Sequence, residues 1–209
     1  MRTLVILLLA LVLGLAAAPA SAMSFHFAKK AGIQVVLAKG DIKRGDAKRL
    51  ARALQKAGRD KHGTKQLLLD SPGGLVAEAF LMAEIMHDAG VSTVVPKGAL
   101  CASACASVLF VSGRYRTVDK GGALAIHSCY DSRSGRMMSD CNALISAHAE
   151  AEGLSGSTMM ALQEAAGSDT VILFDRDDAA CFGLTLQPGK KMSRKTPPCV
   201  AKAMRAARR

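Results

Sequence analysis

Short apolar runs alternate with longer segments of helical periodicity through the middle of the chain, and this alternation restricts the fold more than any other feature. The apolar runs have the length and composition of buried strands and span residues 66–70, 91–96 and 122–128. Between them lie residues 75–89, with apolar side chains at helical spacing, and the apolar segment 102–110. Strands that alternate with helices form parallel sheets joined by right-handed crossovers. The pattern therefore predicts an α/β domain with mostly parallel strands.

Segments on either side of this region extend the same domain. Residues 33–37 are typical of a short strand, and residues 46–58, 138–152 and 155–166 have helical periodicity. Within the helix expected at 75–89, the apolar spacing predicts a core-facing set made of Ala77, Phe80, Leu81, Ile85 and Met86.

Residues 1–22 have the three parts of a secretory signal peptide. Arg2 supplies a positive start, residues 4–18 an apolar run, and Ala20-Ser21-Ala22 a small-residue cleavage site. An uncleaved membrane anchor is the alternative, although the apolar run is short for a span. We expect cleavage near Ala22 and a mature chain that is periplasmic or secreted, with its α/β domain at residues 23–188.

Six cysteines in an exported chain indicate disulfide bonds. Sequence alone does not choose among the pairings that six cysteines allow. We expect Cys129 with Cys141, Cys181 with Cys199, and therefore Cys101 with Cys105. A metal site is the alternative, but the spacings fit no usual zinc pattern and the histidines are scattered, so no metal is expected. No other cofactor is predicted either.

The formal net charge of +11 is concentrated partly in a basic tail at residues 189–209, which ends in Lys202, Arg205, Arg208 and Arg209. Such a tail is either solvated and partly disordered or makes weak contact with anionic membrane or envelope surfaces. Export, together with the absence of Trp and the presence of only two Tyr, argues against a nucleic-acid partner.

Ser103 stands in Gly98-Ala-Leu-Cys-Ala-Ser-Ala-Cys-Ala106, where an expected strand gives way to an expected helix. A nucleophile at a helix start is helped by the helix dipole, and the N–H of Ala104 is placed to bind an oxyanion. The alternative is that Ser103 only caps the helix. Two further segments favour a catalytic role for Ser103: the glycine turn in Leu69-Asp-Ser-Pro-Gly-Gly74 and His127 at a strand end. Acyl transfer needs oxyanion donors, a nucleophile and a base.

These segments, in this order, resemble the Clp protease proteolytic subunit and crotonase superfamily. The resemblance covers roughly residues 34–184 and rests on the Asp-Ser-Pro-Gly-Gly turn, Cys-Ala-Ser-Ala-Cys and Ala125-Ile-His-Ser128. Secreted bacterial Clp-like proteins with a cysteine on each side of the Ser-Ala pair are the nearest likeness. The resemblance implies a repeated β-β-α superhelix and a homo-oligomer. It also implies Ser103 as nucleophile, His127 as base, and the N–H groups of Gly73 and Ala104 as the oxyanion hole.

The third catalytic residue departs from the family pattern. In the family an Asp precedes a helix that ends in an aromatic-Gly-Leu sequence, which is Phe182-Gly183-Leu184 here. The matching position falls near Val171, and Asp169 is the nearest carboxylate before the helix. We therefore expect Asp169 to orient His127. Asp175, Asp177 and Asp178 are better placed to start and cap the helix.

Two functions follow from this reasoning. The first is an exported Clp-like serine hydrolase acting on peptides or unfolded proteins, independent of ATP because the chain has no P-loop motif. The second is a non-catalytic envelope protein that binds peptides or a protein partner through the same groove.

Overall fold

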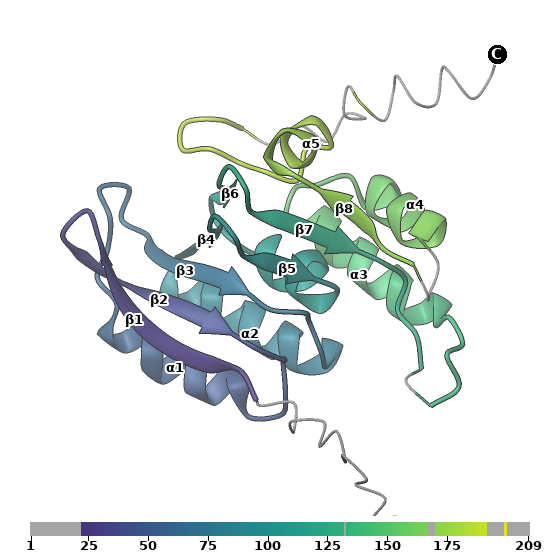
Figure 1. Ribbon diagram of the computed structural model, residues 1–209, viewed down its shortest axis with the longest axis horizontal. Coiled ribbons are helices and arrows are strands. Elements are labelled where there is room, and N and C mark those ends of the chain that lie inside the picture. The colour runs from purple at the N-terminus through teal and green to yellow at the C-terminus, as the bar shows by residue number, and fades with distance from the viewer. Residues whose placement is uncertain (1–21, 132, 167–169, 192–198, 200–209) are drawn as a thin grey trace, which may run out of the picture.

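A computed structural model describes residues 22–131, 133–166, 170–191 and 199 of the 209-residue chain (Figure 1). Residues 1–21, Asp169 and most of the basic tail lie outside the described residues. The expectations of a signal peptide, of a third catalytic residue at Asp169 and of a basic tail therefore fall largely beyond this description.

The larger of two sheets has five strands in the order β1-β2-β3-β4-β6. These strands are β1 (Ser24–Lys30), β2 (Ile33–Lys39), β3 (Lys65–Asp70), β4 (Val91–Val95) and β6 (Arg116–Val118). All neighbours are parallel except β1 and β2, which form an antiparallel hairpin through Ala31 and Gly32. This confirms the predicted α/β class with mostly parallel strands.

The smaller sheet has three strands in the order β5-β7-β8. These are β5 (Leu100–Ala102), β7 (Ala123–Ile126) and the antiparallel β8 (Ile172–Phe174). The two sheets meet at Ser71, the residue after β3. The Ser71 N–H donates to Leu100 O at 2.7 Å, and the Ser71 carbonyl accepts from Ala102 N–H at 2.9 Å. The ends of β3 and β5 are therefore fixed side by side.

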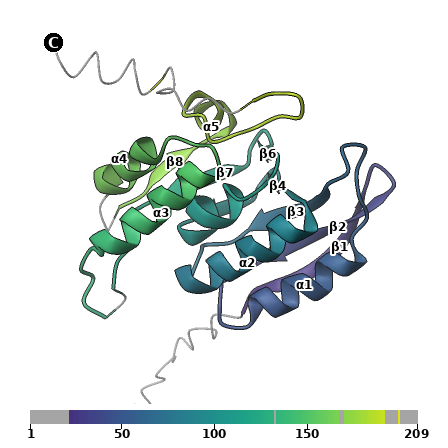
Figure 2. The same ribbon diagram turned by 180° about the vertical axis from the view of Figure 1, so that it is seen from behind.

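Helices pack against both sheets. The helices are α1 (Asp46–Lys56), α2 (Val76–Ala89), α3 (Ser139–Ala151), α4 (Gly156–Ala166) and α5 (Arg176–Cys181). Helices α1 and α2 lie on one face of the large sheet, and α3 continues this layer over the small sheet (Figure 2). The helix expected within residues 102–110 is present as η1 (Cys105–Phe110), a short π-helix that is buried throughout, and Ala102 is the last residue of β5.

The buried face of α2 differs from the expected one. Its buried residues are Glu78, Ala79, Met82, Ala83 and Met86, whereas Leu81 is 51% exposed and Ala77 is exposed. The helix is apolar around most of its circumference, so apolar spacing alone does not select one face.

Glu78 accounts for part of this difference. Its Oε1 accepts hydrogen bonds from the N–H groups of Gly45 and Ala47, at 3.0 and 2.8 Å. These are donors at the start of α1, which has no side-chain cap of its own. A buried carboxylate on α2 thus caps α1 and ties the two helices together.

Candidate functional site

Four of the residues predicted to act in catalysis line one pocket of about 690 Å³. Gly73 follows β3, Ser103 and Ala104 follow β5, and His127 follows β7. Because these parallel strands end on the same side, their C-terminal loops meet there. Apolar side chains complete the wall, among them Leu75, Val76, Met138 and Ile145.

Ser103 has a left-handed backbone conformation, with φ of 56°. Its N–H donates to Ala125 O at 2.8 Å, and its carbonyl accepts from the N–H and the hydroxyl of Ser107, each at 2.9 Å. The residue is thus held between β7 and η1. A non-glycine residue pays about 1 to 2 kcal/mol for this conformation. Strain of this kind persists where the surroundings over-determine it and is frequent at catalytic residues.

The glycine turn lies directly against the backbone around Ser103. A Cβ atom on Gly73 would lie 2.7 Å from Ala102 O and 3.1 Å from Ala104 N, and one on Gly74 would lie 2.3 Å from Ile42 O. Both glycines have positive φ, of 98° and 142°. The turn is therefore wedged between two backbone segments in a way that only glycine permits.

Three residues that line the pocket, Gly73, Gly74 and Ala104, carry backbone N–H donors. The N–H of Gly73 donates to Ser71 Oγ at 3.1 Å. The N–H groups of Gly74 and Ala104 meet no acceptor within the part of the chain that the structure describes. Of the predicted oxyanion pair, Ala104 is therefore open, and Gly74 offers a second open donor beside Gly73.

The His127 ring is oriented by the backbone of its own neighbour. Its Nδ1 lies 2.7 Å from Ser128 O. Because a carbonyl oxygen only accepts hydrogen bonds, this contact favours a proton on Nδ1, and in the neutral form of the ring Nε2 is then without one. This tautomer is the one that a base acting on a serine needs. No hydrogen bond joins the Ser103 hydroxyl to the ring in the described structure, so the proton cannot pass directly between them in this arrangement.

No described carboxylate forms an ion pair with His127. Asp175 is the N-cap of α5, and its Oδ1 accepts from the N–H groups of Asp177 and Asp178 at 2.8 Å each. Asp177 is exposed and pairs with Arg176. These acids therefore lie at the start of α5, where they cap it or occupy its first turn, as predicted from their position in the sequence.

Three cysteine pairs are bonded, and they are the expected ones. Their Cα atoms lie 5.2, 5.9 and 5.5 Å apart, within the range of disulfides, in the pairs Cys101–Cys105, Cys129–Cys141 and Cys181–Cys199. The first pair brackets Ser103, and the second belongs to the rim of its pocket. Disulfides persist in oxidising surroundings, so the chain belongs outside the cytosol.

A buried cluster of polar side chains beside His127 was not predicted from the sequence. It consists of Ser128, Asn142, Ser146 and Gln163, of which the last three lie on α3 and α4. A single Asn or Gln within a helical pattern carries no signal that it will be buried, since its partner is set by how the helices pack.

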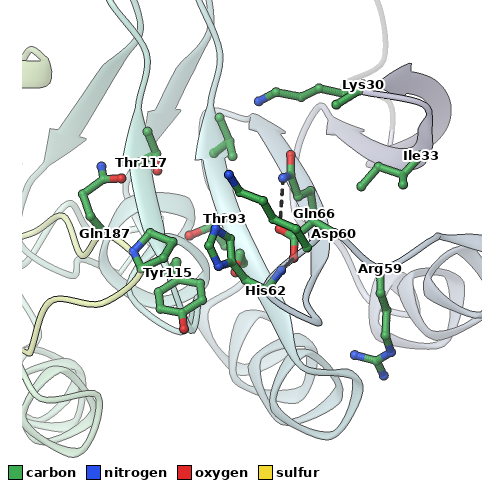
Figure 3. Close-up of a pocket in the computed structure, with 15 residues that line it drawn as sticks. Lys30, Ile33, Arg59, Asp60, His62, Gln66, Thr93, Tyr115, Thr117 and Gln187 are labelled. Carbon is green, nitrogen blue, oxygen red and sulfur yellow. Dashed lines mark hydrogen bonds between the residues drawn. The ribbon is translucent and has the colours of Figure 1, made fainter.

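A second pocket, of about 520 Å³, lies at the other end of the large sheet, where its parallel strands begin (Figure 3). Its lining includes three cations, Lys30, Arg59 and Lys61, and one carboxylate, Asp60. Asp60 caps its own loop by accepting from the N–H groups of His62 and Thr64. Partial burial raises the pKa of Asp60, but the hydrogen bonds that it accepts outweigh this and lower the pKa overall.

Two of the hydroxyls of this second pocket, those of Ser92 and Thr93, are already hydrogen-bonded to the protein. Ser92 Oγ donates to Thr64 Oγ1 at 2.8 Å, and Thr93 Oγ1 donates to Phe110 O at 2.8 Å. Ser92, the serine in this lining, does not have the positive φ that Ser103 has. The pocket of Ser103 is therefore the candidate reaction site.

Within the described ranges, no helix is long and apolar enough to cross a membrane. The same residues contain no group of three or more His, Cys, Asp or Glu arranged to hold a metal ion. No protein-family model matches the chain, and no match to a curated protein is found.

Proposed function

We propose that the chain is an exported Clp-like serine hydrolase, an ATP-independent peptidase in which Ser103 is the nucleophile and His127 the base. The observation that carries the proposal is the pocket shared by Ser103, with its left-handed backbone, and His127, whose Nδ1 lies 2.7 Å from Ser128 O. The motif order, the parallel α/β architecture and the bracketing disulfide support membership of the Clp/crotonase superfamily. The signal-like segment 1–22 and the three disulfides support a periplasmic or secreted location.

The mechanism follows from the side chains and backbone donors in the pocket. Ser103 Oγ attacks a peptide carbonyl while His127 Nε2 removes its proton, and His127 then returns that proton to the leaving amine. The developing oxyanion is bound by Ala104 N–H and by a second donor from the glycine turn, which is Gly74 N–H, or Gly73 N–H once it releases Ser71 Oγ. Water then attacks the acyl-enzyme with His127 again as base, which releases the acid and restores Ser103.

The apolar wall indicates the type of substrate. Leu75 is 51% and Met138 46% exposed, and both line the pocket with Val76 and Ile145. An exposed apolar wall beside a nucleophile favours a peptide with an apolar side chain near the bond that is cut. A short or unfolded peptide fits this groove without the help of an unfoldase.

The test is labelling of the mature, disulfide-intact protein with a fluorophosphonate probe, followed by turnover of apolar peptide substrates. Ser103→Ala should abolish both, whereas Ser107→Ala should retain labelling. Ser107 is the matched control because it lines the same pocket and contacts Ser103 through its hydroxyl. Equal labelling of wild type and Ser103→Ala would remove Ser103 from the mechanism.

The second function, a non-catalytic peptide-binding protein, is favoured by one observation, the lack of a direct hydrogen bond between Ser103 and His127. For such a protein, Ser103→Ala would bind apolar peptides as wild type does, and neither would release products.

A further inference from the structure

The peptide unit between Ser128 and Cys129 is held at both of its polar ends. Its carbonyl, Ser128 O, accepts from His127 Nδ1 at 2.7 Å. Its N–H, on Cys129, donates to Asn142 Oδ1 at 2.7 Å. The C=O and N–H of one peptide unit lie in a common plane, so a partner that fixes the N–H also fixes the direction of the carbonyl. Asn142 therefore acts on His127 through a single rigid peptide.

Asn142 is itself fixed by its surroundings. Its Oδ1 also accepts from Gln163 Nε2 at 3.2 Å, and its Nδ2 donates to Ser128 Oγ at 3.3 Å. Ser128 Oγ in turn donates to Gln163 O at 2.6 Å, and Ser146 Oγ donates to Gln163 Oε1 at 3.3 Å. The orientation of the Asn142 amide is determined chemically, because two N–H donors face Oδ1 and only an oxygen accepts them.

Burial makes this cluster rigid. Ser128 and Gln163 are 0% exposed, Asn142 1% and Ser146 6%. Water does not compete for buried hydrogen bonds, and breaking one leaves a polar group unpaired at a cost of about 1 to 3 kcal/mol. The Cys129–Cys141 disulfide ties the same peptide to the residue before Asn142. The cluster thus has one stable arrangement, in which Ser128 O points at the His127 ring.

We propose that Asn142 is a positioning residue for His127, and that it fills the role expected of Asp169. Through the Ser128–Cys129 peptide it holds the imidazole in the Nδ1-protonated tautomer and leaves Nε2 free for Ser103. The proposal rests on the proposed function insofar as His127 is the base of the reaction. The tautomer itself is a property of the resting protein and is measured without turnover.

The first experiment measures the tautomer by ¹⁵N NMR. The Ser103→Ala protein, labelled in its histidines, is studied about 2 pH units above the usual imidazole pKa of about 6.5, with His127→Gln to assign the signals. Nδ1 should be of the protonated type and Nε2 of the bare type. Asn142→Leu should give a mixture of tautomers, and Asn142→Asp, which keeps an acceptor for Cys129 N–H, should retain the wild-type pattern.

Ser146→Ala is the matched control, since it removes a buried hydrogen bond on the same helix but leaves the Asn142 contact with Cys129 intact. It should leave the tautomer unchanged. An Nδ1-bare ring in the Ser103→Ala protein would overturn the proposal, and so would an unchanged tautomer in Asn142→Leu. A switch of tautomer in Asp169→Asn would equally overturn it. The Asp169→Asn and Ser103→Ala measurements keep the proposal testable if Asn142→Leu does not fold.

The second experiment measures kinetics in the protein with Ser103 intact. Asn142→Leu should lower kcat by about 10-fold to 100-fold, which is part of the roughly 10²-fold to 10⁴-fold that a positioned base contributes, with KM unchanged. Asp169→Asn should stay within about 3-fold of wild type on this scale. Loss of turnover in Asp169→Asn with full turnover in Asn142→Leu would assign the role to Asp169 instead. If the tautomer behaves as expected but Ser103→Ala still labels and turns over, the proposed function fails while the positioning by Asn142 stands.

Discussion

A Cβ atom on Gly73 would lie 2.6 Å from the Cβ of Ser103, closer than real Cβ contacts come. The glycine of the Pro-Gly-Gly turn and the candidate nucleophile therefore fit only because one of them has no side chain. The other atoms that crowd this position belong to the backbone of residues 102 and 104 and cannot rotate away.

Gly73→Ala should disturb the site more than it disturbs the fold. The backbone after β5 must shift, and displacement of a nucleophile by about 1 Å costs about 10²-fold in rate. We expect fluorophosphonate labelling of Ser103 to slow by about that factor. Gly63→Ala is the matched control, because Gly63 has φ of 75° and empty space around its Cβ position. It should share the conformational cost, lower the melting temperature modestly and label at the wild-type rate. Equal labelling rates in wild type and Gly73→Ala would contradict the crowding argument.

Strain at Ser103 predicts that the site is less stable than it could be. Glycine adopts a φ of 56° without the penalty that a Cβ imposes, so Ser103→Gly should be more stable than Ser103→Ala by about 1 kcal/mol. Both should fail to label. Ala31 has a similar φ, of 49°, in the β1–β2 turn, outside the pocket of Ser103. Ala31→Gly should be more stable than wild type by a similar amount and should still be labelled. Urea unfolding measures all four proteins, and a Ser103→Gly variant less stable than Ser103→Ala would show that Ser103 is not strained.

The disulfides predict both a thiol count and an order of stability. The mature protein, denatured without reductant, should present no free thiol to an alkylating reagent. Replacing both Cys129 and Cys141 by Ser should lower the free energy of unfolding by about 3 kcal/mol on chain-entropy grounds, since 12 residues separate them. The same change at Cys101 and Cys105, separated by 4, should cost about 2 kcal/mol. Alkylation of several cysteines without a reductant would contradict the disulfides, and a reversed order of stability would contradict the chain-entropy argument.

Much of the fold could be predicted because its elements carry strong local patterns. The helix expected at residues 46–58 is observed as Asp46–Lys56, since its apolar residues form one narrow stripe. Strand β1 could not be predicted in the same way. Most of its residues are exposed, and it is held by its pairing with β2 rather than by an apolar face of its own. Strand β8 has three residues, too few to show a period.

In the candidate site, too, the residues with a local sequence motif could be predicted and those placed by tertiary packing could not. Gly73, Ser103, Ala104 and His127 come from short motifs at strand ends, and parallel topology brings strand ends together, so their shared pocket follows from the sequence. Asn142 belongs to no motif. Its contact with Cys129 exists only because α3 packs against the loop after β7, which is a property of the tertiary structure.

A histidine outside the reaction site, His148, whose side chain is 14% exposed, predicts how stability depends on pH. His148, on α3, has its Nε2 2.9 Å from Ser112 Oγ, and its ring packs edge-on against Phe80. Burial lowers the pKa of His148, and this outweighs the nearby Glu152 carboxylate, which raises it. The folded protein therefore keeps this ring neutral at pH values where the unfolded chain already binds a proton.

The sign of the effect follows from this difference in proton binding. Above the unfolded pKa, about 6.5, the ring is neutral in both states and contributes no pH dependence. As the pH falls below that value, the unfolded state binds the proton first, so the free energy of unfolding decreases until the folded pKa is reached. We expect the melting temperature of wild type to drop between about pH 7 and pH 5, and His148→Gln, which cannot titrate, to show a smaller drop. His87→Gln is the control, because His87 contacts the same Glu152 at 2.7 Å but is 54% exposed. An equal drop in wild type and His148→Gln would show that the His148 ring does not set the acid sensitivity of the fold.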